Sequence, residues 1–246
     1  MEQHKGFIVL IDISGYTNFV SKHNIDSSKN KKLDFGQAHA EHIISDLLEK
    51  VINELDDVLT INKLQGDAAL FYGISDNDNN LSEKIIKKMQ TSFDAFNNRV
   101  NELKFCEACK CGTCVDVGNL KLKSFVHFGD FLIKEINQFK EIAGQDVILA
   151  HRLMKNSIGV SEYMLFTKSF TEIKDINSLG LIENRVEKYD DMGNVDCSVH
   201  YPDKKLYDIE LSSKKSWFGA KIAMFKYFIN SKSKKNIELK YNLISS

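Results

Sequence analysis

The sequence of 246 residues contains a single proline, Pro202, and no proline- or glycine-rich linker. It shows no internal repeat, so nothing in its composition indicates a solenoid or a string of separate domains. It also lacks an apolar stretch near the ~20 residues needed to cross a bilayer. The formal net charge of −1 excludes a nucleic-acid binder that works through a strongly basic surface.

The opening residues, MEQHKG, do not form the pattern of a secretory signal peptide. Five cysteines are an odd number, and four of them lie within nine residues, which is not typical of a secreted disulfide framework. Apolar residues make up 43% of the chain, which is enough for a full core. We therefore expect a cytoplasmic globular protein with neither a nucleic-acid partner nor contact with a membrane.

Apolar periodicity predicts a mixture of strands and helices. Strands are expected over residues 7–11, 58–63, 68–72, 120–128, 131–136 and 163–167, and helices over 35–55, 81–103 and 144–156. Residues 131–136 are expected to pair back on 120–128 through a turn at Gly129 and Asp130. This order predicts an α+β fold: a ferredoxin-like sandwich with one antiparallel sheet and helices on one face.

Two acids stand at informative positions in this pattern. Asp12 ends the first apolar run, and Asp67 opens the second arm of a hairpin over residues 58–72. If that hairpin pairs beside the first strand, both carboxylates converge at one edge of the sheet. Paired carboxylates with open coordination are typical of Mg²⁺ sites. From spacing alone, the alternative is that each acid is an ordinary turn or cap residue.

Four segments then resemble motifs of one known family. They are FIVLIDISGYT at residues 7–17, KLQGDA at 63–68, LKSFVHFGD at 122–130 and EIAGQDVILAHRL at 141–153. In this order they resemble the catalytic domain of class III nucleotide cyclases, the adenylate and guanylate cyclases, over about residues 6–168. With its added Cys cluster, the chain resembles an atypical, bacterial-looking branch of that family.

The resemblance implies a fold, an activity and a set of site residues. Two domains of such a cyclase pair head to tail, so we expect a homodimer that binds a nucleoside triphosphate, most simply ATP, and forms cyclic AMP and pyrophosphate. Asp12, Asp67 and the carbonyl of Ile13 would bind two Mg²⁺ or Mn²⁺ ions. The resemblance also assigns Lys63 and Glu141 to recognition of the base, and Arg152 to stabilisation of the phosphates.

One position departs from the family pattern. The family places an asparagine four residues before the arginine to orient the ribose, whereas this chain has Ile148. Losing a positioning group costs orders of magnitude in rate. Two alternatives therefore stay open: a catalytically degenerate module for nucleotide binding or dimerisation, and a cyclase for another nucleobase. For Lys63, Glu141 and Arg152 the alternative is ordinary surface ion pairing.

The resemblance also sets the expected domain organisation. Residues 1–180 would form the cyclase-like domain, with a Cys-rich insert at 105–115, and residues 181–246 a C-terminal extension. The Lys- and aromatic-rich block at 214–240 is expected to pack on the core or on a dimer partner, the alternative being a basic amphipathic helix on a membrane.

The cysteines of the insert offer a second metal site. Cys106, Cys109, Cys111 and Cys114 have a spacing that suits tetrahedral Zn²⁺, although four ligands from nine residues is a tight geometry. Free or redox-active thiols are the alternative. His127 is expected to be a structural histidine in a turn at a strand end, and Cys197 a small buried residue.

Overall fold

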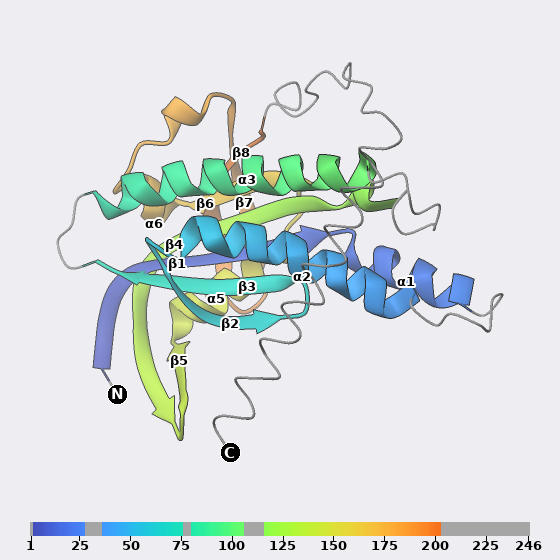
Figure 1. The fold of residues 1–246 in the computed structure, drawn as a ribbon. Helices are drawn as coiled ribbons and strands as arrows, with labels where there is room; N and C mark the ends of the chain where they lie inside the picture. Colours follow the sequence, from blue (N-terminus) through green and yellow to red (C-terminus); the bar gives the residue numbers. More distant parts are fainter. Residues whose placement is uncertain (1, 28–35, 76–79, 106–115, 203–246) are drawn as a thin grey trace.

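The computed structural model of the chain describes residues 2–27, 36–75, 80–105 and 116–202 (Figure 1). The strands are β1 (Glu2–Ser14), β2 (Thr60–Gln65), β3 (Ala68–Ile74), β4 (Lys121–Ile136), β5 (Phe139–Ala143), β6 (Tyr163–Thr167), β7 (Ile182–Tyr189) and β8 (Gly193–His200). The helices are α1 (Tyr16–Ser27), α2 (Gly36–Leu55), α3 (Leu81–Phe105), α5 (Gln145–Leu153) and α6 (Lys168–Thr171), with 3-10 turns η1 (Val117–Asn119) and η2 (Asn177–Leu179). The strands form one eight-stranded sheet in the order β2-β3-β1-β4-β6-β8-β7, with β5 paired to β4.

Strand β1 lies inside this sheet and is buried on both faces. It pairs antiparallel with β3 on one side and with β4 on the other. Because successive side chains of a strand point to opposite faces, β1 contributes to two cores. Val9 and Ile11 enter the core beneath α2 and α3, and Ile8 and Leu10 enter the core beneath α5. The predicted strand at residues 7–11, buried on both faces, is confirmed.

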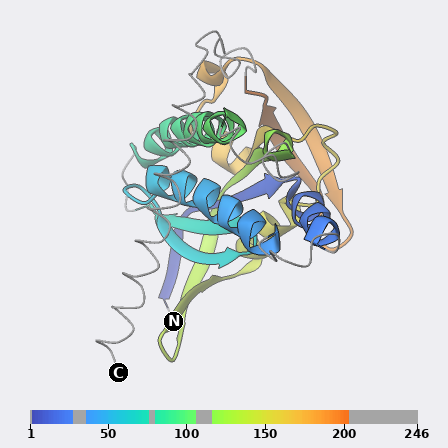
Figure 2. The ribbon, with the colours of Figure 1, turned by 45° about the vertical axis from the view of Figure 1, so that its right-hand side comes forward.

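Helices α2 and α3 lie side by side across one face of the sheet (Figures 1 and 2). Each buries one apolar stripe at helical spacing. The fully buried members of these stripes include Ile43, Leu47 and Val51 on α2 and Ile85, Met89, Phe93 and Phe96 on α3. The two long helices predicted at residues 35–55 and 81–103 are confirmed with nearly the same ends.

The α+β fold class is confirmed, and the structure adds two features to it. Strands β4 and β6 run parallel, so the sheet is mixed and not purely antiparallel. Helix α5 packs on the face opposite α2 and α3, since its apolar residues Val147, Ala150 and Leu153 share a core with Ile8 and Leu10 of β1. The sheet is therefore covered by helices on both faces.

The prediction that residues 131–136 pair back on 120–128 through Gly129 and Asp130 is wrong. Strand β4 runs unbroken through this point because Gly129 and Asp130 stay paired with Gly6 and Lys5 of β1. The chain reverses later, beside Asn137, whose φ of 53° is positive. Strand β5 then pairs back on β4, and this hairpin extends beyond the rest of the sheet (Figure 1).

Residues 182–200 extend the same sheet. Strand β8 pairs with β6, and β7 pairs with β8 to form the edge. The expected C-terminal extension therefore begins as part of the core sheet. Residues 203–246, which include the Lys- and aromatic-rich block, lie outside the described residues. Within the described ranges, no helix is both long and apolar enough to cross a membrane.

The close approach of β1 and β3 at Gly6 can be tested by substitution. A Cβ added at Gly6 would overlap the carbonyl oxygen of Gly73, which is main chain and cannot rotate away. We expect Gly6→Ala to lower the free energy of unfolding by about 1–3 kcal/mol, as for an overpacked core. Chemical denaturation measures this change.

Gly159→Ala is the matched control, since a Cβ there has no neighbour within 4 Å. Equal denaturation midpoints for the two variants would contradict the close approach of Gly6 to the main-chain carbonyl of Gly73.

Candidate active site

The structure brings Asp12 and Asp67 to the same edge of the sheet. Asp12 is the last residue of β1 that pairs with β3, where its partner is Ala68, the residue after Asp67. The N–H of Ile13 donates a hydrogen bond of 3.1 Å to the carbonyl oxygen of Asp67. The hairpin of β2 and β3 therefore pairs beside β1, as the sequence predicted, and joins two acids that are 55 positions apart in the sequence.

The chain turns immediately after Asp12. Gly15 has a φ of 94°, in the left-handed region that favours glycine, and α1 begins at the next residue. The Gly15 carbonyl accepts a hydrogen bond of 3.0 Å from the N–H of Phe19, the first turn of the helix. The expected order of strand, acid, tight turn and helix is present.

Both carboxylates have raised pKa values, and the charge of Asp12 contributes to that of Asp67. Burial raises the pKa of Asp12 above its ordinary value, and the positive charge of Lys123, its partner on β4, offsets part of that rise. Burial and then the negative charge of Asp12 raise the pKa of Asp67 to about 6. Bringing these acids together thus has an electrostatic cost that a bound cation would relieve.

Two further residues beside the acids were not identified from the sequence. The hydroxyl of Tyr16 donates a hydrogen bond of 2.8 Å to Oε1 of Glu41 on α2. The charge of Glu41 also contributes to the raised pKa of Asp67. Helix α2 reaches the site only through tertiary packing, so no local sequence pattern marks Glu41.

The carboxylate pair is incomplete as a metal site by itself. Among the described residues, no group of three or more His, Cys, Asp or Glu side chains is arranged to hold a metal ion. Asp12 and Asp67 fit a divalent cation whose other ligands come from phosphate oxygens, water or main-chain carbonyls. The role predicted for the Ile13 carbonyl stays a prediction.

The two residues expected to read the base lie on different strands. Lys63 on β2 pairs with Leu70, whose side chain enters the core beneath α5, and the charge of Lys63 adds to burial in lowering the pKa of His151 on α5. Glu141 on β5 lies 3.6 Å from Nζ of Lys134 in an ion pair. Among the described contacts, none joins Glu141 to Lys63, so their shared role stays a prediction.

Arg152 is paired within the same chain. Its Nε and Nη2 donate hydrogen bonds of 3.0 and 2.6 Å to Oδ2 of Asp191, in the turn between β7 and β8. No local sequence pattern identifies Asp191 as this partner, since it lies 39 positions from Arg152 in the chain. One helical turn before Arg152, Ile148 is 52% exposed and adds no hydrogen-bonding side chain to this surface.

The remaining candidates fall into three groups. Cys106, Cys109, Cys111 and Cys114, the predicted zinc ligands, lie outside the described residues. Cys197 is buried, as expected, and burial raises its thiol pKa to about 12. His127 is not in a turn: it lies within β4, buried, with Nδ1 2.9 Å from Oγ1 of Thr167, because β4 continues past Gly129.

Comparison with known proteins places the chain in a family. A family model described as a protein of unknown function (DUF2652) matches residues 44–163. The "Uncharacterized protein Rv2561/Rv2562" of Mycobacterium tuberculosis is 30% identical over 166 residues, which span 68% of this chain and 76% of that protein. The chain belongs to the same family as this mycobacterial protein. The region matched by the family model runs from within α2 to the start of β6 and contains Asp67, Glu141 and Arg152.

Solved structures share the fold at low sequence identity. The adenylyl cyclase CyaB of P. aeruginosa is 13% identical with a TM-score of 0.57, over 80% of this chain and 94% of that one. The guanylyl cyclase Cya2 is 12% identical with a TM-score of 0.55, over 80% and 91%. A class III adenylyl cyclase-like ATP-binding protein from Pseudomonas aeruginosa is 15% identical with a TM-score of 0.53, over 72% and 36%. The chain therefore has the fold of class III cyclase catalytic domains.

The raised pKa of Asp67 gives a test in the absence of metal. The folded protein binds this proton more tightly than the unfolded chain, so ionisation of Asp67 lowers stability above a pH of about 6. We expect Asp67→Asn to raise stability at about pH 8 by about 1 kcal/mol, a value reduced for partial exposure to solvent. Thermal unfolding in a chelator should show this gain shrinking as the pH falls from about 6 towards the ordinary value of 3.8.

Asp94→Asn, at an exposed carboxylate on α3, is the control and should show no such gain. An identical melting temperature for Asp67→Asn and wild type across this pH range would refute the raised pKa of Asp67.

Proposed function

We propose that this chain is a class III nucleotidyl cyclase-like enzyme that converts ATP to cyclic AMP and pyrophosphate as a head-to-tail homodimer. The observation that carries the proposal is the convergence of Asp12 and Asp67 at one sheet edge within a cyclase fold. Two interacting carboxylates, with ordinary pKa values near 4 and raised here, suit divalent cations that arrive with a triphosphate.

In this proposal each group has a defined task. Asp12 and Asp67 hold two Mg²⁺ or Mn²⁺ ions, which when bound lower the pKa of the ribose 3′-hydroxyl and neutralise charge on the phosphates. The 3′-oxygen forms a bond to the α-phosphorus as the bond between α- and β-phosphates breaks, pyrophosphate leaves, and the hydroxyl proton passes to solvent. Arg152 donates to the phosphate oxygens, where its planar fork of N–H groups matches their geometry.

Recognition of the base is assigned to Lys63 and Glu141. Lys63 donates to a ring nitrogen or carbonyl of the base, and Glu141 accepts from the amino group of adenine. Because Glu141 is paired with Lys134 in the described structure, this assignment requires that ion pair to open or to form part of the pocket. A cyclase for another base is therefore the first alternative, and comparing the four nucleoside triphosphates separates it from an adenylate cyclase.

A non-catalytic nucleotide-binding module is the second alternative, and one observation favours it. Ile148 is exposed at the position where the resemblance expects an asparagine, so no side chain there can hydrogen-bond to the ribose. A solved neighbour of the same fold is itself titled a cyclase-like ATP-binding protein, although it is only 15% identical. Nucleotide binding by wild type without any turnover would identify the chain as such a module.

The direct test is to incubate the full chain with each nucleoside triphosphate and Mn²⁺ and to detect cyclic product by mass spectrometry. We expect cyclic AMP from wild type and at least a roughly hundredfold loss of turnover in Asp12→Ala or Asp67→Ala, since each removes a metal ligand. Asp94→Asn should keep wild-type turnover. Absence of product from every triphosphate, with Asp12→Ala binding nucleotide as well as wild type, would overturn the proposal.

A gain of function gives a second test. We expect Ile148→Asn to raise turnover by about tenfold or more, because a hydrogen bond that orients the ribose improves the alignment of the attacking oxygen. The exposure of Ile148 makes the change tolerable for folding. Steady-state kinetics should show the gain mainly in kcat.

Ile173→Asn is the matched control, since Ile173 is 47% exposed outside the site. An unchanged kcat in Ile148→Asn would mean that α5 does not contact the ribose.

A further inference from the structure

The binding edge of Arg152 is already occupied by a carboxylate of its own chain. Nε and Nη2 form one edge of the guanidinium, and both donate to the same oxygen of Asp191. This edge is one that could bind a phosphate through two parallel hydrogen bonds. Asp190, next to Asp191 in the turn, is also exposed and adds a second negative charge. An incoming polyphosphate therefore meets an arginine that is neutralised and flanked by acids.

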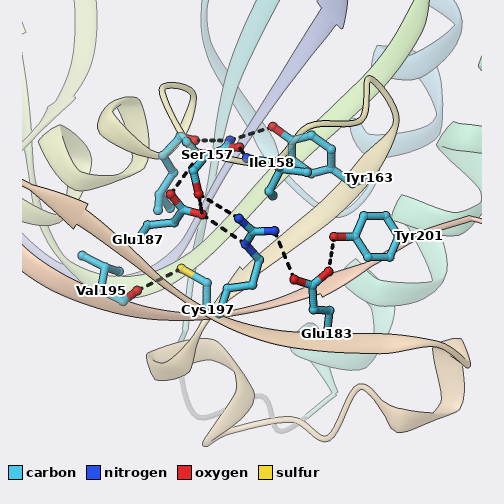
Figure 3. Close-up of polar contacts among 11 residues, drawn as sticks. Ser157, Ile158, Tyr163, Glu183, Glu187, Val195, Cys197 and Tyr201 are labelled. Carbon is cyan, nitrogen blue, oxygen red and sulfur yellow. Dashed lines mark hydrogen bonds and ion pairs between the residues drawn. The ribbon is translucent and has the colours of Figure 1, made fainter.

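The turn that carries Asp191 is anchored to the segment that follows α5. Glu187 on β7 is only 4% exposed and accepts hydrogen bonds of 2.9 Å from both the N–H and the hydroxyl of Ser157 (Figure 3). Arg185 donates to Glu187 at 3.2 Å and to the Ser157 hydroxyl at 2.7 Å. Ser157 lies five residues after Arg152, so this cluster sets the distance between β7 and the end of α5.

The same cluster continues along the hairpin. Arg185 also donates at 3.1 Å to Glu183, which accepts a hydrogen bond of 2.6 Å from the hydroxyl of Tyr201 (Figure 3). A buried carboxylate with several donors is rigid and costly to disrupt. These hydrogen bonds hold the β7–β8 hairpin in place, and the hairpin in turn positions Asp191 beside Arg152.

We propose that Asp191 caps Arg152 and thereby sets the affinity of this site for polyphosphate. The identity of the ligand as a nucleoside triphosphate rests on the proposed function, but the cap acts on any polyphosphate that uses Arg152. The cap is displaceable, since the side chains of Arg152 and Asp191 are 44% and 47% exposed and an ion pair this exposed to water is weak. A polyanion with several charges competes with it directly.

Removal of the cap should strengthen binding. We expect Asp191→Asn to bind inorganic tripolyphosphate and a non-cyclisable ATP analogue about three- to tenfold more tightly than wild type, the size expected for losing one exposed pair and one repulsive charge. In the Arg152→Gln background, Asp191→Asn should give no such gain, because the capped group is absent. Isothermal titration of the full chain measures all four variants.

Asp190→Asn is the matched control for simple loss of negative charge, since it removes a neighbouring acid in the same turn. A gain of equal size in Asp190→Asn, or in the Arg152→Gln background, would show a general charge effect and overturn the cap. Equal or weaker binding by Asp191→Asn would also overturn it, since Asp191 would then orient Arg152 or play no part. Absence of tripolyphosphate binding in both wild type and Asp191→Asn overturns it as well.

The binding experiments test the cap separately from the proposed cyclase activity. Tighter tripolyphosphate binding by Asp191→Asn, dependent on Arg152, supports the cap even where no triphosphate yields a cyclic product. Conversely, cyclic product from wild type with no change in Asp191→Asn supports the enzyme and removes the cap.

Discussion

Strand β1 is buried on both faces over residues 6–11 and carries a carboxylate, Asp12, directly after this run, and the rest of this structure depends on that constraint. The burial of β1 between β3 and β4 leaves its backbone no freedom of register, because a shift by one residue would exchange the two cores. The strand therefore has one position in the sheet, which fixes the place of Asp12, two residues before the strand ends at Ser14. The pairing of β3 then places Asp67 beside it, where burial raises the pKa of both acids and the negative charge of Asp12 raises the pKa of Asp67 further.

Charges are arranged asymmetrically around this point. Asp12, Asp67 and Glu41 concentrate negative charge that Lys123 balances only in part. The basic side chains that could bind the phosphates of a triphosphate lie on other elements. One of them, Arg152, is already paired with an acid of the same chain. In the proposed function, such an arrangement would attract divalent metal ions first, and anionic phosphates would approach once those ions had reduced the negative potential.

The C-terminal hairpin has a larger part in the site than its position in the chain suggests. Strands β7 and β8 lie at the sheet edge opposite β2, yet their turn reaches the end of α5. The buried Glu187 fixes the position of the turn relative to α5, since moving Glu187 away from Ser157 would leave its charge without partners in the interior. The edge of the sheet and the arginine of α5 are thus parts of one structural unit.

Most of the elements and the main pair of acids could be predicted from the amino-acid sequence. The run before Asp12, the glycine turn after it and the hairpin around Asp67 are local patterns, and local patterns of burial and turn chemistry are what a sequence shows directly. Only the tertiary structure decided that β4 continues past Gly129, that α5 covers the second face, and that Glu41 and Asp191 approach Asp67 and Arg152. Those contacts join residues far apart in the chain, and their energy comes from packing and charge between elements, which no local pattern records.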